Sequence, residues 1–562
     1  MLPILLPKMR ITARAERFMA WSVAATAILI SLLFVRKIWQ TNDDVAMAMV
    51  SQGYGIASVP SPGIVFSNVV WGWILTHMPA IAGLDPYSLA TYTALIVSAT
   101  AIALSLDHRQ TPPLLAASVL VTMFVPTIAT PQFTLTAGYL TIAGIAVLLA
   151  WKDSSSQTYL WVSGILLLMA GLIRPLEFMF VAVLSLPFLY LMRPIVIWRW
   201  LILVTVVVLL LLTAHFIDAA YYSSPAWSPF QQMNRIRVAF TDYGLLDYFR
   251  AHPDAVGNGN LDANDLTLVS RWFYPDPRVF NPAAFAAPLQ AVKLTARLWM
   301  NLRNFRHLQM LLDTTQLMDL VALLLLSLAA FRSKLRPVIV ALAMLMAAFL
   351  YFHVLGRSSV ARVYVPAIAT MAILYLLMIG RDERLLVRAT GMTLLIAATA
   401  FTLWDLSPRM HGPDRQRATM ETALCKLPQD RLWVAWGNSS FTYQLLYRPG
   451  LQSQPACELH FYALGTMQLA PSSQAMVEQY TGAPNVVAAL LQGKHIYMFT
   501  EQDRLELLKR YFDEHYKTAL NLELKLKIPH ATVYDVWVGG PAAQRLEQSH
   551  PGQSDDDDTG GG

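Results

Sequence analysis

Long apolar runs recur along this chain of 562 residues, and they constrain its fold more than any other feature. Each run of about 17 to 25 residues is long enough, as a helix, to cross the roughly 30 Å of hydrocarbon in a bilayer. Charged residues make up only 14% of the sequence, against about 25% in a typical soluble domain. We therefore predict a polytopic α-helical membrane protein. A closed barrel would instead show short segments of alternating polarity.

Eleven transmembrane helices are predicted from these runs. The first run follows a basic segment and is followed by Arg36 and Lys37, not by a small-residue cleavage site, so we expect a retained helix and no signal peptide. The predicted spans lie near residues 18–36, 87–106, 112–129, 133–150, 158–174, 176–192, 197–217, 316–331, 337–354, 363–379 and 386–404.

A further apolar segment, residues 62–79, could either cross the membrane or lie flat in its interface. Asn68, Gly72 and Thr76 interrupt one of its faces, as in an interfacial helix. If the segment lies flat and the N-terminus is cytoplasmic, most basic residues of the short loops fall on the cytoplasmic side. A spanning segment would invert every later loop, so we predict that it lies flat. The net charge of +6 then follows from cytoplasmic loops, and no nucleic-acid partner is expected.

This topology places three polar regions on the outer face. They are the first outer loop (residues 37–86), the long outer loop (residues 218–315) and the region after about residue 405. We therefore predict a membrane domain over residues 1–404, a small periplasmic domain over residues 405–544 and a disordered tail over residues 545–562.

The C-terminal domain is predicted to be α/β, because apolar strand-like runs alternate with a helical one. The strands are expected at 432–436, 495–500, 522–527 and 532–538, and the helix at 503–516. The only two cysteines, Cys425 and Cys457, both fall in this domain. We predict that they form a disulfide in an oxidising compartment. Two separate buried thiols are the alternative.

Two adjacent carboxylates, Asp43 and Asp44, stand at the membrane surface just beyond the first predicted span. Adjacent acids repel one another, so at least one of them should have a partner or a raised pKa. They are therefore the candidate catalytic residues, with Asp44 slightly preferred. The alternative is structural: Asn42 or Asp43 would be the N-cap of a helix over residues 45–52.

Arginines also occur at the outer ends of later predicted helices, where positive charge is least expected. Arg357 and Arg362 fall in the turn between the spans at 337–354 and 363–379, and Tyr364 follows. A guanidinium group can bind phosphate through two parallel hydrogen bonds, so this turn is a candidate phosphate-binding site. The alternative is that these arginines only reach toward lipid headgroups.

Further candidate substrate-binding residues lie at other outer positions. Arg174 and Glu177 stand at an outer turn, although an ion pair between them would explain them equally well. The long outer loop carries acids and aromatic residues that could hold sugar hydroxyls and stack on a sugar ring, or merely anchor interfacial helices. The candidates in this loop are Asp242, Asn264, Asp265 and Trp272.

Taken in order along the chain, these features resemble the GT-C superfamily of glycosyltransferases. The likeness covers residues 15–405 and rests on the segment Asn42-Asp43-Asp44-Val45, on Asn264-Asp265 with Trp272 and Asp276, and on Arg362-Val-Tyr364-Val-Pro366. The last segment is a loose match to the Arg-Tyr-x-x-Pro of that superfamily, and the C-terminal domain has no recognised glycan-binding signature.

The resemblance implies an inverting glycosyltransferase of the bacterial inner membrane that takes a sugar from a polyprenyl-phosphate donor. Asp44 or Asp43 would deprotonate the acceptor hydroxyl, and Arg357 and Arg362 would neutralise the departing phosphate. The acceptor would be an envelope glycan, lipid or protein. Some members use a divalent metal, but the sequence shows no ligand set for one.

Three other classes of function fit the same sequence, and one of them is an accessory structural subunit. A ligase or polymerase of surface polysaccharide would also use outer-face arginines, but would place its signature in a late large loop. A transporter or flippase would show internal repeats and ionisable groups near the middle of its spans. Here the ionisable groups cluster at predicted span ends, which favours surface chemistry.

Overall fold

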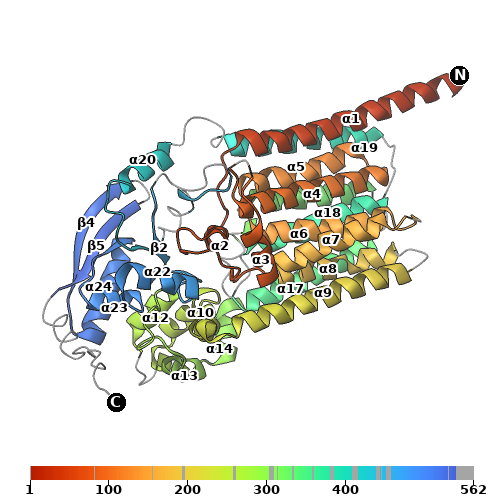
Figure 1. The fold of residues 1–562 in the computed structure, drawn as a ribbon. Coiled ribbons are helices and arrows are strands. Elements are labelled where there is room, and N and C mark those ends of the chain that lie inside the picture. Colours follow the sequence, from red (N-terminus) through yellow and green to blue (C-terminus); the bar gives the residue numbers. More distant parts are fainter. Residues whose placement is uncertain are drawn as a thin grey trace, which may run out of the picture.

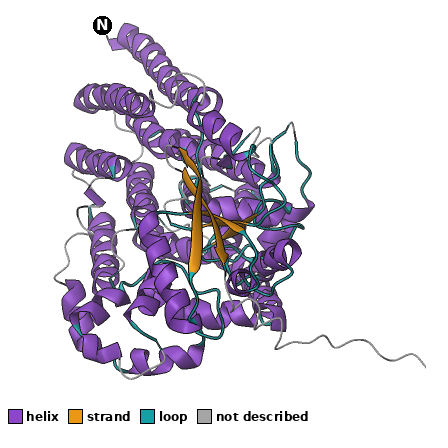
Figure 2. Ribbon diagram, turned by 90° about the vertical axis from the view of Figure 1, so that its left-hand side faces the viewer, coloured by secondary structure: helices purple, strands orange, loops and turns teal. Residues whose placement is uncertain are grey.

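The computed structural model describes most of the chain, and all that follows concerns the described part. Within it the chain is mostly helical, with one sheet near the C-terminal end (Figures 1 and 2). The described residues are 2–81, 83–154, 156–192, 197–256, 261–302, 309, 311–312, 314–331, 335–356, 360–379, 385–407, 415–437, 444, 446–450, 457–528 and 531–539. The predicted tail at 545–562 lies outside them.

A helix lies at each of the eleven positions predicted to cross the membrane. Six of these helices are long and apolar enough to span by length and composition, and the other five are shorter apolar helices. The predicted class, a polytopic helical membrane protein, is confirmed. The eleven are α1 (Leu2–Phe34), α4 (Pro86–His108), α5 (Pro113–Ala129), α6 (Phe133–Ala150), α7 (Thr158–Ile173), α8 (Pro175–Leu191), α9 (Trp198–Tyr222), α16 (Thr315–Phe331), α17 (Arg336–Val354), α18 (Ala361–Ile379) and α19 (Leu385–Leu406).

The burial of these helices matches a bundle surrounded by lipid. Every residue of α6 is buried, and α6 packs against α4, α7, α8 and α18. In contrast, α9 leaves many of its leucine and valine side chains exposed, although it is the most apolar of the long helices. An apolar helix with an exposed apolar surface is stable only where the surrounding solvent is also apolar.

In its described residues, the first outer loop contains two short helices and no further span. These are α2 (Asn42–Gln52) and α3 (Val69–His77). The nine residues of α3 rise only about 14 Å, which is too short to cross the hydrocarbon. The segment 62–79 therefore does not span, as its predicted flat placement requires, and the helix within it is shorter than that segment. Both helices lie at the same end of the bundle as the long outer loop and the C-terminal sheet (Figure 1).

The long outer loop folds into a series of short helices. Polar residues cap several of them; Asp262, for example, accepts a hydrogen bond from the backbone of Asp265, and the Asp265 side chain accepts one in return. The elements are the 3₁₀ helices η1 (Pro225–Trp227) and η2 (Pro253–Val256), and the α-helices α10 (Ser228–Thr241), α11 (Leu245–Ala251), α12 (Ala263–Ser270), α13 (Pro282–Gln290) and α14 (Leu294–Leu302).

The C-terminal region forms the predicted α/β domain around a five-stranded sheet (Figure 2). The strand order is β2-β1-β3-β5-β4; β2, β1 and β3 are parallel, and β5 and β4 continue the sheet antiparallel. The predicted strands and helix are all present, and β2 was not predicted. The elements are α20 (Arg415–Leu424), β1 (Trp433–Ala435), β2 (Phe461–Ala463), α22 (Pro471–Thr481), α23 (Val486–Leu491), β3 (Ile496–Phe499), α24 (Gln502–Tyr516), β4 (Leu520–Ile528) and β5 (Ala531–Val538).

Both faces of the central strands β1 and β3 are buried, whereas much of the edge strand β4 is exposed. Each buried face packs against a different part of the chain. Val434 and Met498 belong to a core that also contains residues of α10 to α13 in the long outer loop. Trp433 and Phe499, which alternate with them along the strands, belong to the core that continues into the membrane helices. The long outer loop and the C-terminal domain therefore share one hydrophobic core, which we did not predict.

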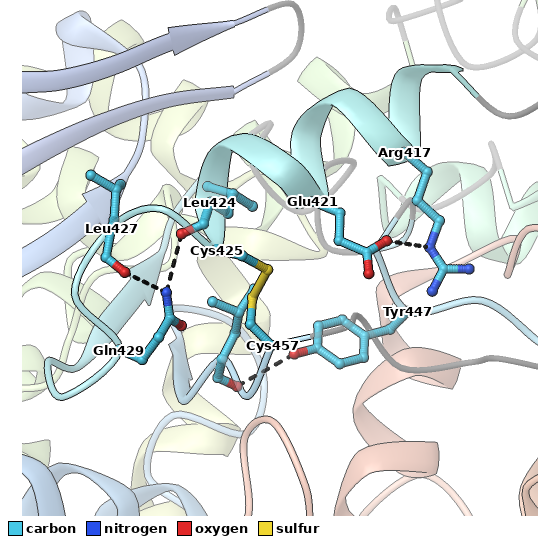
Figure 3. The surroundings of a disulfide bond; sticks show 9 residues. Arg417, Glu421, Leu424, Cys425, Leu427, Gln429, Tyr447 and Cys457 are labelled. Carbon is cyan, nitrogen blue, oxygen red and sulfur yellow. Dashed lines mark hydrogen bonds and ion pairs between the residues drawn. A yellow bond between two sulfur atoms is a disulfide. The ribbon is translucent and has the colours of Figure 1, made fainter.

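The predicted disulfide between Cys425 and Cys457 is present (Figure 3). It joins the end of α20 to the segment that leads into β2, with 5.6 Å between the two Cα atoms. The two cysteines are 32 residues apart in the sequence, so the bond closes a loop that would be free in the unfolded chain. Figure 3 also shows Tyr447 beside the disulfide, donating a hydrogen bond to the carbonyl of Leu459.

Candidate functional site

Asp44 lies in the first turn of α2, is completely buried and is fully hydrogen-bonded. Its Oδ1 accepts hydrogen bonds from the Tyr87 hydroxyl (3.0 Å) and the Phe133 backbone N–H (3.0 Å), and its Oδ2 accepts one from Thr41 Oγ1 (2.6 Å). Burial raises the pKa of Asp44 to about 7, although these hydrogen bonds favour the charged form. Asp44 thus anchors α2 to the starts of α4 and α6.

Asp43, its neighbour, is half-buried and makes no hydrogen bond with any described residue. Loss of water raises the pKa of Asp43, and the positive charges of Arg362, Arg174 and Arg237 lower it in that order. The N-cap of α2 is Thr41, so the alternative that Asn42 or Asp43 caps the helix is wrong. Asp43 is therefore the carboxylate of the pair that is free to act on a ligand.

Arg174 stands at the junction of α7 and α8. Its Nη1 donates to the Phe66 carbonyl (3.0 Å), and its guanidinium carbon lies 5.3 Å from the centre of the Phe133 ring. The backbone N–H of Phe133 also donates to Asp44. Arg174 is thus fixed against the same residue that anchors Asp44, with its charge directed to the region of Asp43.

Glu177 lies in the first turn of α8 and is only 3% exposed. Its Oε1 is buried and has no hydrogen-bond partner among the described residues. It lies beside Gly138 and Pro366 at a close contact between α6 and α18. A buried carboxylate oxygen without a partner is costly, which marks Glu177 as a candidate for contact with a ligand hydroxyl.

The Arg-x-Tyr-x-Pro segment forms the start of α18. Arg362 lies in the first turn, half-exposed, and its charge acts on both Asp43 and Glu177. Tyr364 is buried, with its ring 6.0 Å from that of Phe349, and its hydroxyl has no partner among the described residues. Arg357 lies outside the described residues.

Arg237 of α10 is a further member of this cluster, and it was not among the predicted site residues. It is 5% exposed; its Nε and Nη2 donate to Asn234 Oδ1 (2.9 and 2.6 Å), and its Nη1 lies 3.5 Å from Asp242 Oδ1. The sequence nevertheless contains a signal that could have identified Arg237. Arg237 falls on the apolar face of α10, in helical register with Phe230, Met233 and Phe240, where an arginine is not expected unless it has a specific partner.

Trp272 packs on Arg237, whose guanidinium carbon lies 4.8 Å from the centre of the indole ring system. The backbone of Trp272 is left-handed, with φ of 69°, at the position after α12 where glycine is usual. A left-handed bulky residue costs free energy, so its side chain must contribute something that glycine would not. The Trp272 ring packs both on Arg237 and on the core that the long outer loop shares with the C-terminal domain.

Asn264 and Asp265, by contrast, are used in the contact between the long outer loop and α24. The amide of Asn264 donates to the Leu507 carbonyl (3.2 Å), and Asp265 Oδ1 lies 2.9 Å from His515 Nε2. Asp265 is fully buried, and burial raises its pKa. These contacts account for Asp265 and for the NH₂ group of Asn264, whose Oδ1 is buried without a hydrogen-bond partner among the described residues.

A metal ion cannot be assigned to this cluster from the part of the chain that the structure describes. There, no group of three or more His, Cys, Asp or Glu side chains could hold one. The cluster consists instead of one half-buried carboxylate, two further acids and arginines from three different elements. Such a set can accept a proton at one point and neutralise an anion beside it.

Solved structures of ArnT from Cupriavidus metallidurans are similar to this chain. The crystal structure bound to undecaprenyl phosphate has a TM-score of 0.43 and 10% sequence identity, over 92% of this chain and 97% of its own. The structure in the apo state has a TM-score of 0.43 and 12% identity, over 93% and 98%. At these values the likeness establishes neither a shared fold nor a shared activity. No family model matches the sequence, and no curated protein matches it.

Proposed function

We propose that the protein is an inverting glycosyltransferase of the GT-C type, which moves a sugar from a polyprenyl-phosphate donor to an acceptor of the cell envelope. One observation carries the proposal: Asp43 is a half-buried carboxylate without a hydrogen bond from any described residue, held among the charges of three arginines. A general base beside a site for an anionic leaving group is what such a transfer requires.

Asp43, and not Asp44, is the base in this proposal. The acceptor hydroxyl gives its proton to the Asp43 carboxylate while its oxygen forms a bond to the anomeric carbon. The bond from that carbon to the phosphate oxygen breaks on the opposite side, so the configuration inverts. Polyprenyl phosphate leaves with the bonding electrons. Asp44, whose oxygens already accept three hydrogen bonds, holds α2 so that Asp43 faces the acceptor.

Arg362 is the main phosphate ligand in this proposal, because its charge acts most strongly on Asp43. Arg174 adds a second positive charge from a position fixed by Phe66 and Phe133. Charge develops on the phosphate oxygens as the bond breaks, so fixed guanidinium groups stabilise the transition state more than the ground state. Arg357 stays a predicted member of the same set.

One acid, Glu177, and one hydroxyl, that of Tyr364, are proposed to contact the donor. Glu177 offers a buried oxygen with no partner among the described residues, and a sugar hydroxyl would satisfy it. Asp242 is already paired with Arg237, so its part is to hold that arginine in place. Tyr364, with a buried and unpartnered hydroxyl, is proposed to bond to the phosphate or to the sugar.

We further propose that the protein lies in a bacterial inner membrane with its N-terminus in the cytoplasm and its C-terminal domain in the periplasm. The charge asymmetry of the short loops supports this orientation. The disulfide supports it independently, because such bonds persist in oxidising compartments. The two outer loops and the C-terminal domain lie at one end of the bundle, as one shared outer face requires (Figure 1).

The test is transfer of labelled sugar from a panel of polyprenyl-phosphate sugars to envelope acceptors, in membranes that contain the unaltered protein or Asp43→Asn at matched expression. We expect transfer from at least one donor and its loss in the variant. No transfer by the unaltered protein from any donor, together with movement of a lipid-linked sugar across the bilayer, would instead identify a flippase.

A further inference from the structure

A second site lies where the first outer loop meets the C-terminal domain. A pocket of about 350 Å³ opens between residues 53–58, just after α2, and residues of the segments around β2 and α22. No residue of the Asp43 cluster lines it. The lining side chains used below are Tyr54, Tyr447, Glu458, His460, Gln479 and Tyr480.

The walls of this pocket are fixed in several ways. The backbone N–H of Phe461 donates to the Gly55 carbonyl (2.9 Å), which joins β2 to the first outer loop. The rings of Tyr54 and Tyr447 stack at 5.7 Å between centroids. Cys457 lines the pocket, and its disulfide ties this wall to α20 (Figure 3). The pocket is therefore pre-formed, which lowers the entropic cost of binding.

The chemistry of the pocket favours sugar rings over phosphate. His460 and Tyr480 both line the pocket and stack on one another at 4.3 Å, so each ring covers one face of the other and can offer only its opposite face or its edge to a sugar. Glu458, whose side chain is 93% exposed, and the amide of Gln479 offer groups for hydroxyls. No lysine or arginine is found among the described residues that line it. An anion would find no counter-charge here, in contrast to the arginines around Asp43.

The position of the pocket relates it to Asp43. Asp43 lies in the first turn of α2, and Gly53, which lines the pocket, follows the last residue of the same helix. Ten residues of helix separate the two, a rise of about 15 Å. A ligand that occupies the pocket and also presents a hydroxyl to Asp43 must therefore be longer than a single sugar ring.

We propose that this pocket binds the sugar rings of an uncharged or basic oligosaccharide acceptor. Its non-reacting end rests on the stacked His460 and Tyr480 rings while its terminal hydroxyl reaches Asp43. The assignment rests on the proposed glycosyltransferase function. The two sites then divide the substrates by charge: the arginine cluster takes the phosphate of the donor, and this pocket takes the neutral part of the acceptor.

Binding can be tested separately from catalysis. Full-length Asp43→Asn protein in nanodiscs is titrated with tetrasaccharides of glucose, mannose, galactose and N-acetylglucosamine, and saturation-transfer NMR reports contact. We expect at least one to bind, and Tyr480→Ala to weaken it about 2- to 10-fold, the range for loss of one aromatic stacking contact. Tyr480→Phe should bind normally, and Lys494→Ala, an exposed change in the same domain, is the matched control.

Several outcomes overturn the proposal. One is no binding by any of the four probes, and another is equal binding by Tyr480→Ala with an unchanged melting temperature. Displacement of the tetrasaccharide by undecaprenyl phosphate would place it at the arginine cluster and not in the pocket. Because the variant is catalytically inactive, failure here leaves the transfer assay unaffected. Transfer to monosaccharide acceptors as fast as to oligosaccharides would also contradict the proposal while the glycosyltransferase function stands.

Discussion

The adjacent pair Asp43 and Asp44 should respond in opposite ways to substitution by asparagine. Asp43→Asn removes the proposed base, and loss of a general base typically slows a reaction about 10²- to 10⁴-fold. Nothing in the described structure hydrogen-bonds to Asp43, so the melting temperature should not fall. Asp44→Asn should reduce transfer less than about tenfold, because it leaves the base in place.

The stability of the Asp44 variants follows from its three hydrogen bonds. In Asp44→Asn, Oδ1 can still accept from Tyr87 and Phe133, and the amide can donate to the Thr41 hydroxyl. In Asp44→Ala, the Tyr87 hydroxyl and the Phe133 N–H lose their acceptor while both residues stay buried. Each unsatisfied donor costs about 1 to 3 kcal/mol, so Asp44→Ala should lose about 2 to 6 kcal/mol of stability.

The pKa of Asp44 adds a dependence of stability on pH. Folding raises the pKa of Asp44 from 3.8 to about 7, so protonation of Asp44 favours the folded state. This contribution to the free energy of unfolding is fully present below pH 3.8. It is lost as the pH rises through about 7. Asparagine does not titrate, so the melting temperature of Asp44→Asn should fall less between pH 5 and pH 8 than that of the unaltered protein.

The assays are sugar transfer in membranes at matched expression and thermal unfolding of purified protein in detergent. The reasoning fails if Asp44→Asn abolishes transfer while folded and Asp43→Asn keeps it, because the roles of the two acids would then be exchanged. It also fails if Asp44→Ala unfolds at the same temperature as the unaltered protein, since its three hydrogen bonds would then contribute nothing.

Three further changes test the surroundings of Asp43. Arg362→Gln should lower kcat/KM and move the acid limb of its pH profile to higher pH, because Arg362 lowers the pKa of Asp43. If the acid limb does not move, Arg362 does not influence the pKa of the catalytic base. Trp272→Ala should reduce transfer about tenfold through loss of its contact with Arg237, while Trp272→Phe should retain most activity, and equal activity of the two variants would remove that role. Cys425→Ser opens the 32-residue disulfide loop and should destabilise the protein by about 4 kcal/mol, which would lower its melting temperature. The control variant Ser472→Ala keeps the disulfide and should unfold at a higher temperature than Cys425→Ser.

The membrane helices could be predicted because the signal for each is local. An apolar run long enough to cross a bilayer has few other uses, so length and composition decide the element without knowledge of its neighbours. The same reasoning worked for the strands β3 and β5, whose apolar residues form continuous or alternating runs. It failed for β2 (Phe461–Ala463), which pairs in parallel with β1, a strand far from it in the sequence.

The union of the long outer loop with the C-terminal domain depends on contacts that no local pattern contains. The indole N–H of Trp436 donates to the Arg271 carbonyl (2.6 Å), 165 residues away in the sequence. Asp276 accepts from the hydroxyls of Tyr511 (2.6 Å) and Tyr516. Polar residues of this loop were predicted to bind a substrate because a sequence shows which side chains are polar but not which of them already have partners.

The choice between Asp43 and Asp44 likewise depends on contacts that the sequence does not show. Successive residues of an α-helix point about 100° apart, so when one acid of an adjacent pair faces into the bundle, the other must face away from that direction. A pair at the start of such a helix therefore supplies one anchored and one free carboxylate. Which is which depends on the donors that meet the helix, and two of the three donors to Asp44 lie 43 and 89 residues further along the chain. The pair thus predicts the site, while the positions of Tyr87 and Phe133 decide which acid performs the chemistry.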